Sequence, residues 1–106
     1  MIVYVVYINI EKGCEEEWLS WMKNTHIPEI MNLKIFLKNE IFRIFHSCVK
    51  SPENYNSYCI KYYAKSLKGY NLYQKKYAKK IQEKHSNKYK NQFNATRQIL
   101  ELINEY

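Results

Sequence analysis

The segment that most constrains the fold is residues 2–10, where β-branched and aromatic side chains occupy both sides of an alternating pattern. Successive side chains of a strand point to opposite faces of its sheet. The apolar residues that would share one face are Ile2, Tyr4, Val6 and Ile8, and those on the other face are Val3, Val5 and Tyr7. A strand that is apolar on both faces is buried on both faces. The protein must therefore cover its sheet on each side.

A helix is predicted after the break at Lys12-Gly13. Three glutamates at residues 15–17 would lie in its first turn, where the helix dipole favours carboxylates. One apolar arc would carry Trp18, Leu19, Trp21, Met22, Thr25 and His26. Because Pro28 cannot continue the backbone ladder, we expect the helix to run to about Asn24. A kink or a fresh start would follow near Thr25-His26, with a short turn over residues 29–31.

The rest of the chain predicts a hairpin, a second helix and a closing strand. Strands over residues 35–47 and 55–65 would pair across the turn-forming cluster at residues 51–54. Ser66 can cap a helix over residues 67–84 whose inner stripe would be Tyr70, Tyr73, Tyr77 and Ile81. Lysines 68, 75, 76, 79 and 80 would face solvent. Residues 93–103 suit a helix almost as well as a strand, and we choose the strand.

This order, β-α-β-β-α-β, predicts an α+β, ferredoxin-like fold over residues 1–106 as one domain. Both helices would pack on one face of a four-stranded antiparallel sheet and leave the other face open. An open face as apolar as residues 2–10 suggest would be too large a patch for a monomer. We therefore expect a homodimer, a dimeric α+β barrel, joined through the sheet face and enclosing a cavity between the two sheets.

Net charge and cysteines bear on partners and location. The net charge is +7, and ten lysines against one glutamate fall within residues 61–90. Such a surplus suits nucleic acid, but A/T-rich codons alone would also produce it, since 15 of the 17 basic residues are lysine. No apolar run is long enough to span a membrane, so we expect no membrane partner. Without a secretion signal, Cys14, Cys48 and Cys59 predict reduced thiols in the cytoplasm.

Three stretches carry a resemblance to a known family. They are the opening M-I-V-Y, the run E-W-L-S-W-M-K-N-T-H-I-P-E-I-M at residues 17–31, and Y-Y-A-K-S-L-K-G-Y at residues 62–70. The chain resembles a family of short uncharacterised bacterial proteins classed as a domain of unknown function, and W-x-x-W-M-x-x-x-H-I-P is the most specific part. The resemblance implies a ferredoxin-like dimeric α+β barrel and a strand at residues 93–103. It implies no activity.

A more distant resemblance concerns the helix that carries tryptophan and H-x-P. It is similar to the dimeric α+β barrel superfamily of small monooxygenases, isomerases and ethyl-tert-butyl-ether-degradation-like proteins. Some of those proteins place a histidine from this region in the barrel pocket. Only His26 and Pro28 correspond here.

His26 is the leading candidate for a catalytic residue. It shares the apolar arc with Trp18 and Met22, so its imidazole could face a pocket and act as a general acid or base on a small organic molecule. A core or capping histidine is the alternative. Trp18 and Trp21 could form flat walls for a ligand and Tyr4 and Tyr62 could place hydroxyls beside it, although all four suit a packed core as well.

Other chemistries find little support. His26, His46 and His85 are far apart, and only a pairing of His46 opposite Cys59 across the hairpin suggests a metal site. The sequence has two glycines, too few to build a phosphate-binding loop. Because it also lacks the usual spacing of metal ligands, it predicts no metal and no cofactor.

RNA-recognition domains share the strand order, and Val6-Tyr7-Ile8 fits their shorter signature. The longer signature is incomplete at residues 56–62, which argues against nucleic acid. The sequence therefore predicts a homodimeric small-molecule-binding protein, whose catalytic form would be an isomerase- or monooxygenase-like enzyme. A non-catalytic structural or regulatory dimer is the nearest alternative.

Overall fold

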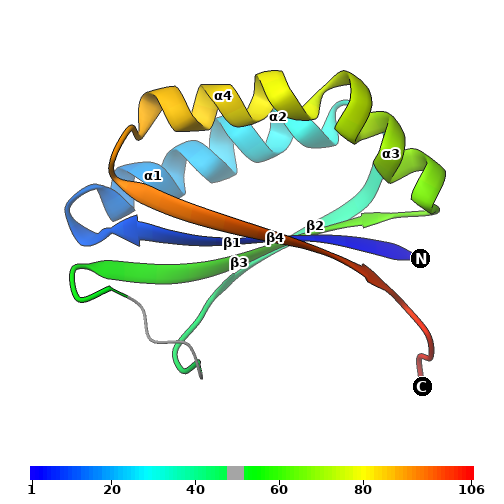
Figure 1. Cartoon of the computed structure of the whole chain (residues 1–106), viewed down its shortest axis with the longest axis horizontal. Coiled ribbons are helices and arrows are strands. Elements are labelled where there is room, and N and C mark those ends of the chain that lie inside the picture. The colour runs from blue at the N-terminus through cyan, green and yellow to red at the C-terminus, as the bar shows by residue number, and fades with distance from the viewer. Residues whose placement is uncertain (48–51) are drawn as a thin grey trace.

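The computed structural model describes residues 1–47 and 52–106. Its elements run in the order β-α-β-β-α-β, with each helical part divided (Figure 1). They are β1 (Ile2–Glu11), the 3-10 turn η1 (Lys12–Cys14), α1 (Glu15–Trp21), the π-helical turn η2 (Met22–His26), α2 (Ile27–Met31), β2 (Phe36–Arg43), β3 (Tyr55–Ala64), α3 (Leu67–Lys76), α4 (Ala78–Lys88) and β4 (Phe93–Glu101). The predicted ferredoxin-like α+β fold is confirmed.

The strand predicted from residues 2–10 lies inside the sheet. The four strands are ordered β2-β3-β1-β4, and every neighbouring pair is antiparallel. Val6 of β1 pairs with Ile60 of β3 on one side and with Arg97 of β4 on the other. The tail is the strand β4, because pairing with β1 satisfies its backbone along one whole edge. All the helices cover one face of the sheet (Figure 1).

The first helical segment changes near Thr25-His26, where a kink or a fresh start was expected: η2 ends at His26 and α2 begins at Ile27, but the chain stays helical through this point. It continues through the π-helical turn η2, where the Ile27 N–H bonds the Met22 carbonyl five residues earlier. Pro28 then falls in the first turn of α2, where a missing N–H costs little. The wide turn therefore accommodates the proline without ending the helix, and it keeps Met22 and His26 buried.

The second helix is longer than predicted and is broken at Tyr77, whose backbone (φ −125°, ψ −31°) leaves the helical region. Ser66 caps α3 as expected, since its hydroxyl accepts a bond from the Gly69 N–H. After the break the buried stripe is Ala78, Ile81 and His85. Tyr77, predicted to face inward, is exposed. The lysines predicted to face solvent do so.

The hairpin register corrects the pairing of His46 with Cys59. Phe42 is opposite Cys59, and β2 ends at Arg43, so His46 lies past the paired strand. Cys48 and the first residue of the predicted turn, Ser51, lie outside the described residues.

The open face of the sheet is more polar than expected. A small apolar cluster at its centre consists of Val3, Val5 and Cys59. Hydrogen-bonded polar pairs from β1 and β4 lie beside it, Tyr7 with Gln98 and Asn9 with Asn94. The main core lies on the other face, between the sheet and the helices. Among the residues that the structure describes, no helix is long and apolar enough to cross a membrane.

Candidate functional site

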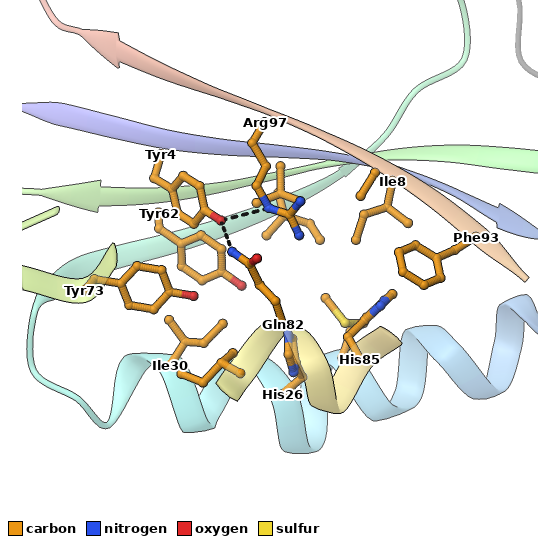
Figure 2. Close-up of a pocket in the computed structure, with 15 residues that line it drawn as sticks. Tyr4, Ile8, His26, Ile30, Tyr62, Tyr73, Gln82, His85, Phe93 and Arg97 are labelled. Carbon is orange, nitrogen blue, oxygen red and sulfur yellow. Dashed lines mark hydrogen bonds between the residues drawn. The ribbon is translucent and has the colours of Figure 1, made fainter. Parts of the chain in front are cut away.

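A small cavity opens between the sheet and the helices of one chain, where Figure 2 shows it in close-up. The sequence had led us to expect a cavity between the sheets of two copies. Its volume is about 30 Å³, room for about two water molecules. Its lining residues come from β1, β3, β4, η2, α2, α3 and α4: Tyr4, Val6, Ile8, Met22, His26, Ile30, Ile60, Tyr62, Tyr73, Ile81, Gln82, His85, Phe93, Ala95 and Arg97.

His26 reaches this cavity from the π-helical turn η2. The side chain is 7% exposed, and its Nδ1 atom is buried with no hydrogen-bond partner in the part of the chain that the structure describes. The ring of Trp21 stacks on the imidazole at 4.7 Å between centroids. A buried ring nitrogen without a partner is unusual and calls for an explanation.

His85 lines the same cavity from α4, and its ring lies 5.7 Å from that of His26. The indole N–H of Trp18 donates to Nε2 of His85 at 2.8 Å. An indole only donates, so Nε2 must be the unprotonated nitrogen and Nδ1 must carry the ring hydrogen. Trp18 therefore sets the tautomer of His85. Phe93 packs edge-on against the same ring at 4.4 Å.

Burial keeps both imidazoles neutral. Desolvation lowers the pKa of His26 from 6.5 to about 4, while Glu29 opposes the shift and Lys84 adds to it. Desolvation likewise lowers the pKa of His85 to about 4, with His26 and Arg97 adding to the effect. At neutral pH each ring is therefore a proton acceptor and not a proton donor in acid–base exchange.

Tyrosine hydroxyls face the histidines across the cavity. Tyr4, Tyr62 and Tyr73 all line it, and their hydroxyls point inward from β1, β3 and α3 (Figure 2). Burial raises the pKa of Tyr62 and of Tyr73 well above the usual value. These two groups keep their protons at neutral pH and present O–H donors to whatever occupies the cavity.

The Tyr4 hydroxyl joins two other residues that line the cavity. It accepts hydrogen bonds from Arg97 Nε at 3.1 Å and from Gln82 Nε2 at 3.4 Å. Gln82 reaches up from α4 and Arg97 reaches across from β4 to meet on this oxygen (Figure 2).

The structure brings together His26, Tyr4 and Tyr62 of the residues predicted for a site. Trp18 and Trp21 do not line the cavity but lie behind it, Trp18 against His85 and Trp21 against His26.

Sequence reasoning missed His85, Gln82, Arg97 and Tyr73 as lining residues. The helical spacing of Ile81 and His85 was a usable signal for one of them. Arg97 could not be found in this way, because its role depends on the pairing of β4 with β1.

The remaining candidates stay apart. Within residues 1–47 and 52–106, no group of three or more histidine, cysteine or acidic residues could hold a metal ion. Cys14 and Cys59 are free, and burial raises the pKa of each thiol, which lowers its nucleophilic reactivity at neutral pH.

A family model described as a domain of unknown function (DUF4286) matches residues 1–103. No curated protein sequence matches the chain.

Solved structures match over nearly the whole chain. A dimeric ferredoxin-like protein from an uncultured marine organism is 12% identical with a TM-score of 0.69, covering 100% of this chain and 98% of its own. An EthD family protein from Bacillus halodurans is 17% identical with a TM-score of 0.64, at 97% and 100% coverage. SnoaB, a cofactor-independent oxygenase from Streptomyces nogalater, is 10% identical with a TM-score of 0.65, at 98% and 95% coverage. At these identities the likeness concerns the fold alone.

Proposed function

The chain belongs to the DUF4286 family of domains of unknown function, and from that premise we propose that it binds a small organic molecule in the helix-side cavity and removes a proton from it with His26. The observation that carries this proposal is the Nδ1 atom of His26, which is buried at the cavity, neutral and without a partner. A ligand that brings an acidic proton to this atom would satisfy it.

The surrounding groups suit proton transfer. The imidazole of His26 takes the proton, and the electron pair stays on the ligand as an enolate or phenolate. Tyr62 and Tyr73 hold their protons and donate hydrogen bonds to the developing oxyanion, which stabilises it in a site shielded from water. Return of the proton to a different atom of the ligand completes an isomerisation and consumes no co-reactant. Because the pKa of His26 is about 4, the ligand must be unusually acidic, such as a phenol or a 1,3-dicarbonyl compound.

An oxygenase reaction is the second candidate for the same site. SnoaB, with the same fold, is described as a cofactor-independent oxygenase. In this chain the enolate left after proton removal by His26 would form a C–O bond with molecular oxygen, which enters as a co-substrate. Loss of water from the resulting hydroperoxide would leave one oxygen atom on the ligand as a carbonyl group and release the other.

Dimerisation through the open sheet face is part of the proposal. The small apolar cluster of Val3, Val5 and Cys59, ringed by polar pairs, resembles the core and rim of a protein interface. A neighbour of the same fold is described as dimeric. We place the dimer in the cytoplasm, where Cys14 and Cys59 would stay reduced.

Two alternatives remain in view. A non-catalytic structural or regulatory dimer is favoured by the small volume of the cavity, about 30 Å³. RNA binding is disfavoured by the direction of the aromatic side chains, since Tyr62 ends the incomplete signature and is buried on the helix side of the sheet. The aromatic residues Tyr7, Phe42 and Tyr63 lie on the open face, but none of them belongs to the longer signature at residues 56–62.

The first test is native mass spectrometry of the freshly purified protein, followed by the denatured mass of the same sample. We expect twice 13.0 kDa with an adduct that is lost on denaturation. The identified adduct is then incubated with protein in D₂O. Wild type is expected to incorporate deuterium, His26→Gln to lose this exchange, and the exposed control His46→Gln to retain it. Exchange that survives in His26→Gln would refute the catalytic role, and a dimer without any adduct would favour the non-catalytic alternative.

A further inference from the structure

The chain has only two arginines, and each of them hydrogen-bonds the hydroxyl of a buried tyrosine. Arg43 bonds Tyr58 through Nε at 3.3 Å and Nη2 at 3.1 Å. Arg97 bonds Tyr4 through Nε at 3.1 Å. The two tyrosines are equally buried, each 2% exposed, so the two pairs can be compared directly.

The first pair is completed by a carboxylate. Tyr58 accepts from Arg43 and donates its own proton to Glu15 Oε2. The other oxygen of Glu15 accepts from Asn56 Nδ2 at 2.8 Å. The side chain of Glu15 therefore has a tyrosine O–H and an amide N–H as donors, with a guanidinium beside them. Charge and hydrogen bonds are both balanced in this cluster.

The second pair has the same parts but no carboxylate. Tyr4 accepts from Arg97 and from the amide N–H of Gln82, whereas the amide N–H of Asn56 in the first cluster is donated to the carboxylate of Glu15. Within residues 1–47 and 52–106, the Tyr4 proton has no acceptor, and the terminal nitrogens of Arg97 form neither a hydrogen bond nor an ion pair. These donors all belong to residues that line the cavity (Figure 2).

We infer that Tyr4, Gln82 and Arg97 form a carboxylate-binding subsite, in which the ligand's carboxylate takes the place that Glu15 takes beside Tyr58 and Arg43. Guanidinium and carboxylate match in geometry and charge, and their hydrogen bonds are stronger than those between neutral groups. The apolar lining at Ile8, Ile60 and Phe93 would then receive the uncharged body of the ligand. The ligand class is a small carboxylic acid with an apolar body.

This inference rests on the proposed ligand pocket but not on catalysis by His26. The proposed subsite also explains why residue 97 is an arginine. A lysine has a single side-chain nitrogen, so it could not bond Tyr4 through one nitrogen and offer others in the same plane to an anion. The contact of Gln82 with Tyr4 is long, at 3.4 Å, so a carboxylate can displace the amide at little cost.

The test uses three carboxylates of increasing size, each paired with its neutral amide: acetate with acetamide, isobutyrate with isobutyramide, and benzoate with benzamide. Binding is measured by NMR titration at pH 7 on wild type, Arg97→Gln, Tyr4→Phe and Arg43→Gln. We expect at least one carboxylate to bind more tightly than its amide. Arg97→Gln should weaken that carboxylate about tenfold or more and its amide less than about twofold, the range for a charge-assisted hydrogen bond. Arg43→Gln, which loses an equivalent bond to a tyrosine away from the cavity, should leave both affinities unchanged.

Two results would overturn the subsite. One is that no carboxylate binds better than its amide, and the other is that Arg97→Gln and Arg43→Gln affect the carboxylate equally. A preference for carboxylates that depends on Arg97 but survives in His26→Gln would keep the subsite, whatever the deuterium exchange shows about proton transfer. The two proposals therefore fail on different measurements.

Discussion

The indole of Trp18 and the imidazole of His85 are joined by a hydrogen bond of 2.8 Å across 67 residues of sequence. Trp18 is fully buried in α1, and His85 is 5% exposed in α4. The bond ties together the two helical segments that cover the sheet. It also sets which nitrogen of His85 carries the hydrogen, so one contact serves both the core and the candidate site.

Replacing Trp18 by phenylalanine should therefore destabilise the fold more than the same change at Trp21. Trp18→Phe leaves the buried Nε2 of His85 without a donor, which costs about 1–3 kcal/mol in addition to lost packing. Trp21 stacks on His26 and its N–H forms no bond within the described part of the chain, so Trp21→Phe removes packing only. Urea unfolding of both variants measures the difference. Equal midpoints would show that the Trp18–His85 bond contributes nothing net to stability.

The fold was predictable because its strongest signals are local. The two-sided apolar pattern of residues 2–10 requires an inner strand, and the helix and hairpin signals around it leave few topologies. The break at Tyr77 was not predictable, since the tyrosines at residues 70, 73 and 77 continue a helical stripe without interruption. Packing onto the sheet prefers Ala78 there and turns Tyr77 outward. The π-helical turn was missed for a similar reason, because Pro28 on its own predicts an ending.

The candidate site was predictable only in part. His26 could be found because it lies on the apolar arc of its own helix, and Tyr4 because it lies on the buried strand. The subsite at Tyr4 needs Arg97 from β4 and Gln82 from α4, which only the tertiary fold brings together. Trp18 and Trp21 were placed on the right arc, but the same arc also holds His26, and His26 occupies the position next to the cavity.

Stability should decrease with acid in a window set by the two buried histidines. Their pKa is about 4 in the folded protein against 6.5 for an ordinary histidine, so the unfolded chain binds protons first as pH falls. The free energy of unfolding therefore has its full value above pH 6.5 and decreases as the pH falls from 6.5 to about 4. The decrease amounts to about 3 kcal/mol per histidine.

His26→Gln should remove part of this pH dependence, and His46→Gln, at an exposed position, should leave it unchanged. The measurement is the free energy of unfolding in urea at a series of pH values from 8 to 4. A wild-type profile that is flat from pH 6.5 to 5 would contradict the burial of neutral imidazoles.

Dimerisation through the open sheet face should be sensitive to Leu100 and insensitive to Leu72. Leu100 pairs with Val3 on the open face and is 41% exposed, while Leu72 on α3 is 42% exposed on the helical side. Because the two leucines are equally accessible in the single chain, a lysine at either one costs the monomer little. Native mass spectrometry should show a monomer for Leu100→Lys and a dimer for Leu72→Lys. A dimer that persists in Leu100→Lys and separates in Leu72→Lys would place the interface on the helices.

The two tyrosine–arginine clusters should respond differently to loss of the tyrosine hydroxyl. Tyr58→Phe removes the acceptor of Arg43 and the donor to Glu15 together, so we expect a loss of about 1–2 kcal/mol in the free energy of unfolding. Tyr4→Phe, at an equally buried position, removes a hydroxyl whose proton has no acceptor within the described residues. Its two donors, Arg97 and Gln82, can turn to water, and the expected loss is below about 0.5 kcal/mol.

Urea unfolding at pH 7 measures the free energy of unfolding of the two phenylalanine variants. The same measurement is repeated with a saturating carboxylate. Added carboxylate should raise the stability of wild type and of Tyr58→Phe by the same amount, because the ligand binds only the folded chain and Tyr58 lies outside the subsite. It should raise that of Tyr4→Phe by less, since one donor to the anion is missing. If Tyr4→Phe without ligand is as destabilised as Tyr58→Phe, the Tyr4 hydroxyl stabilises the folded chain, and its proton is not available to hydrogen-bond a ligand.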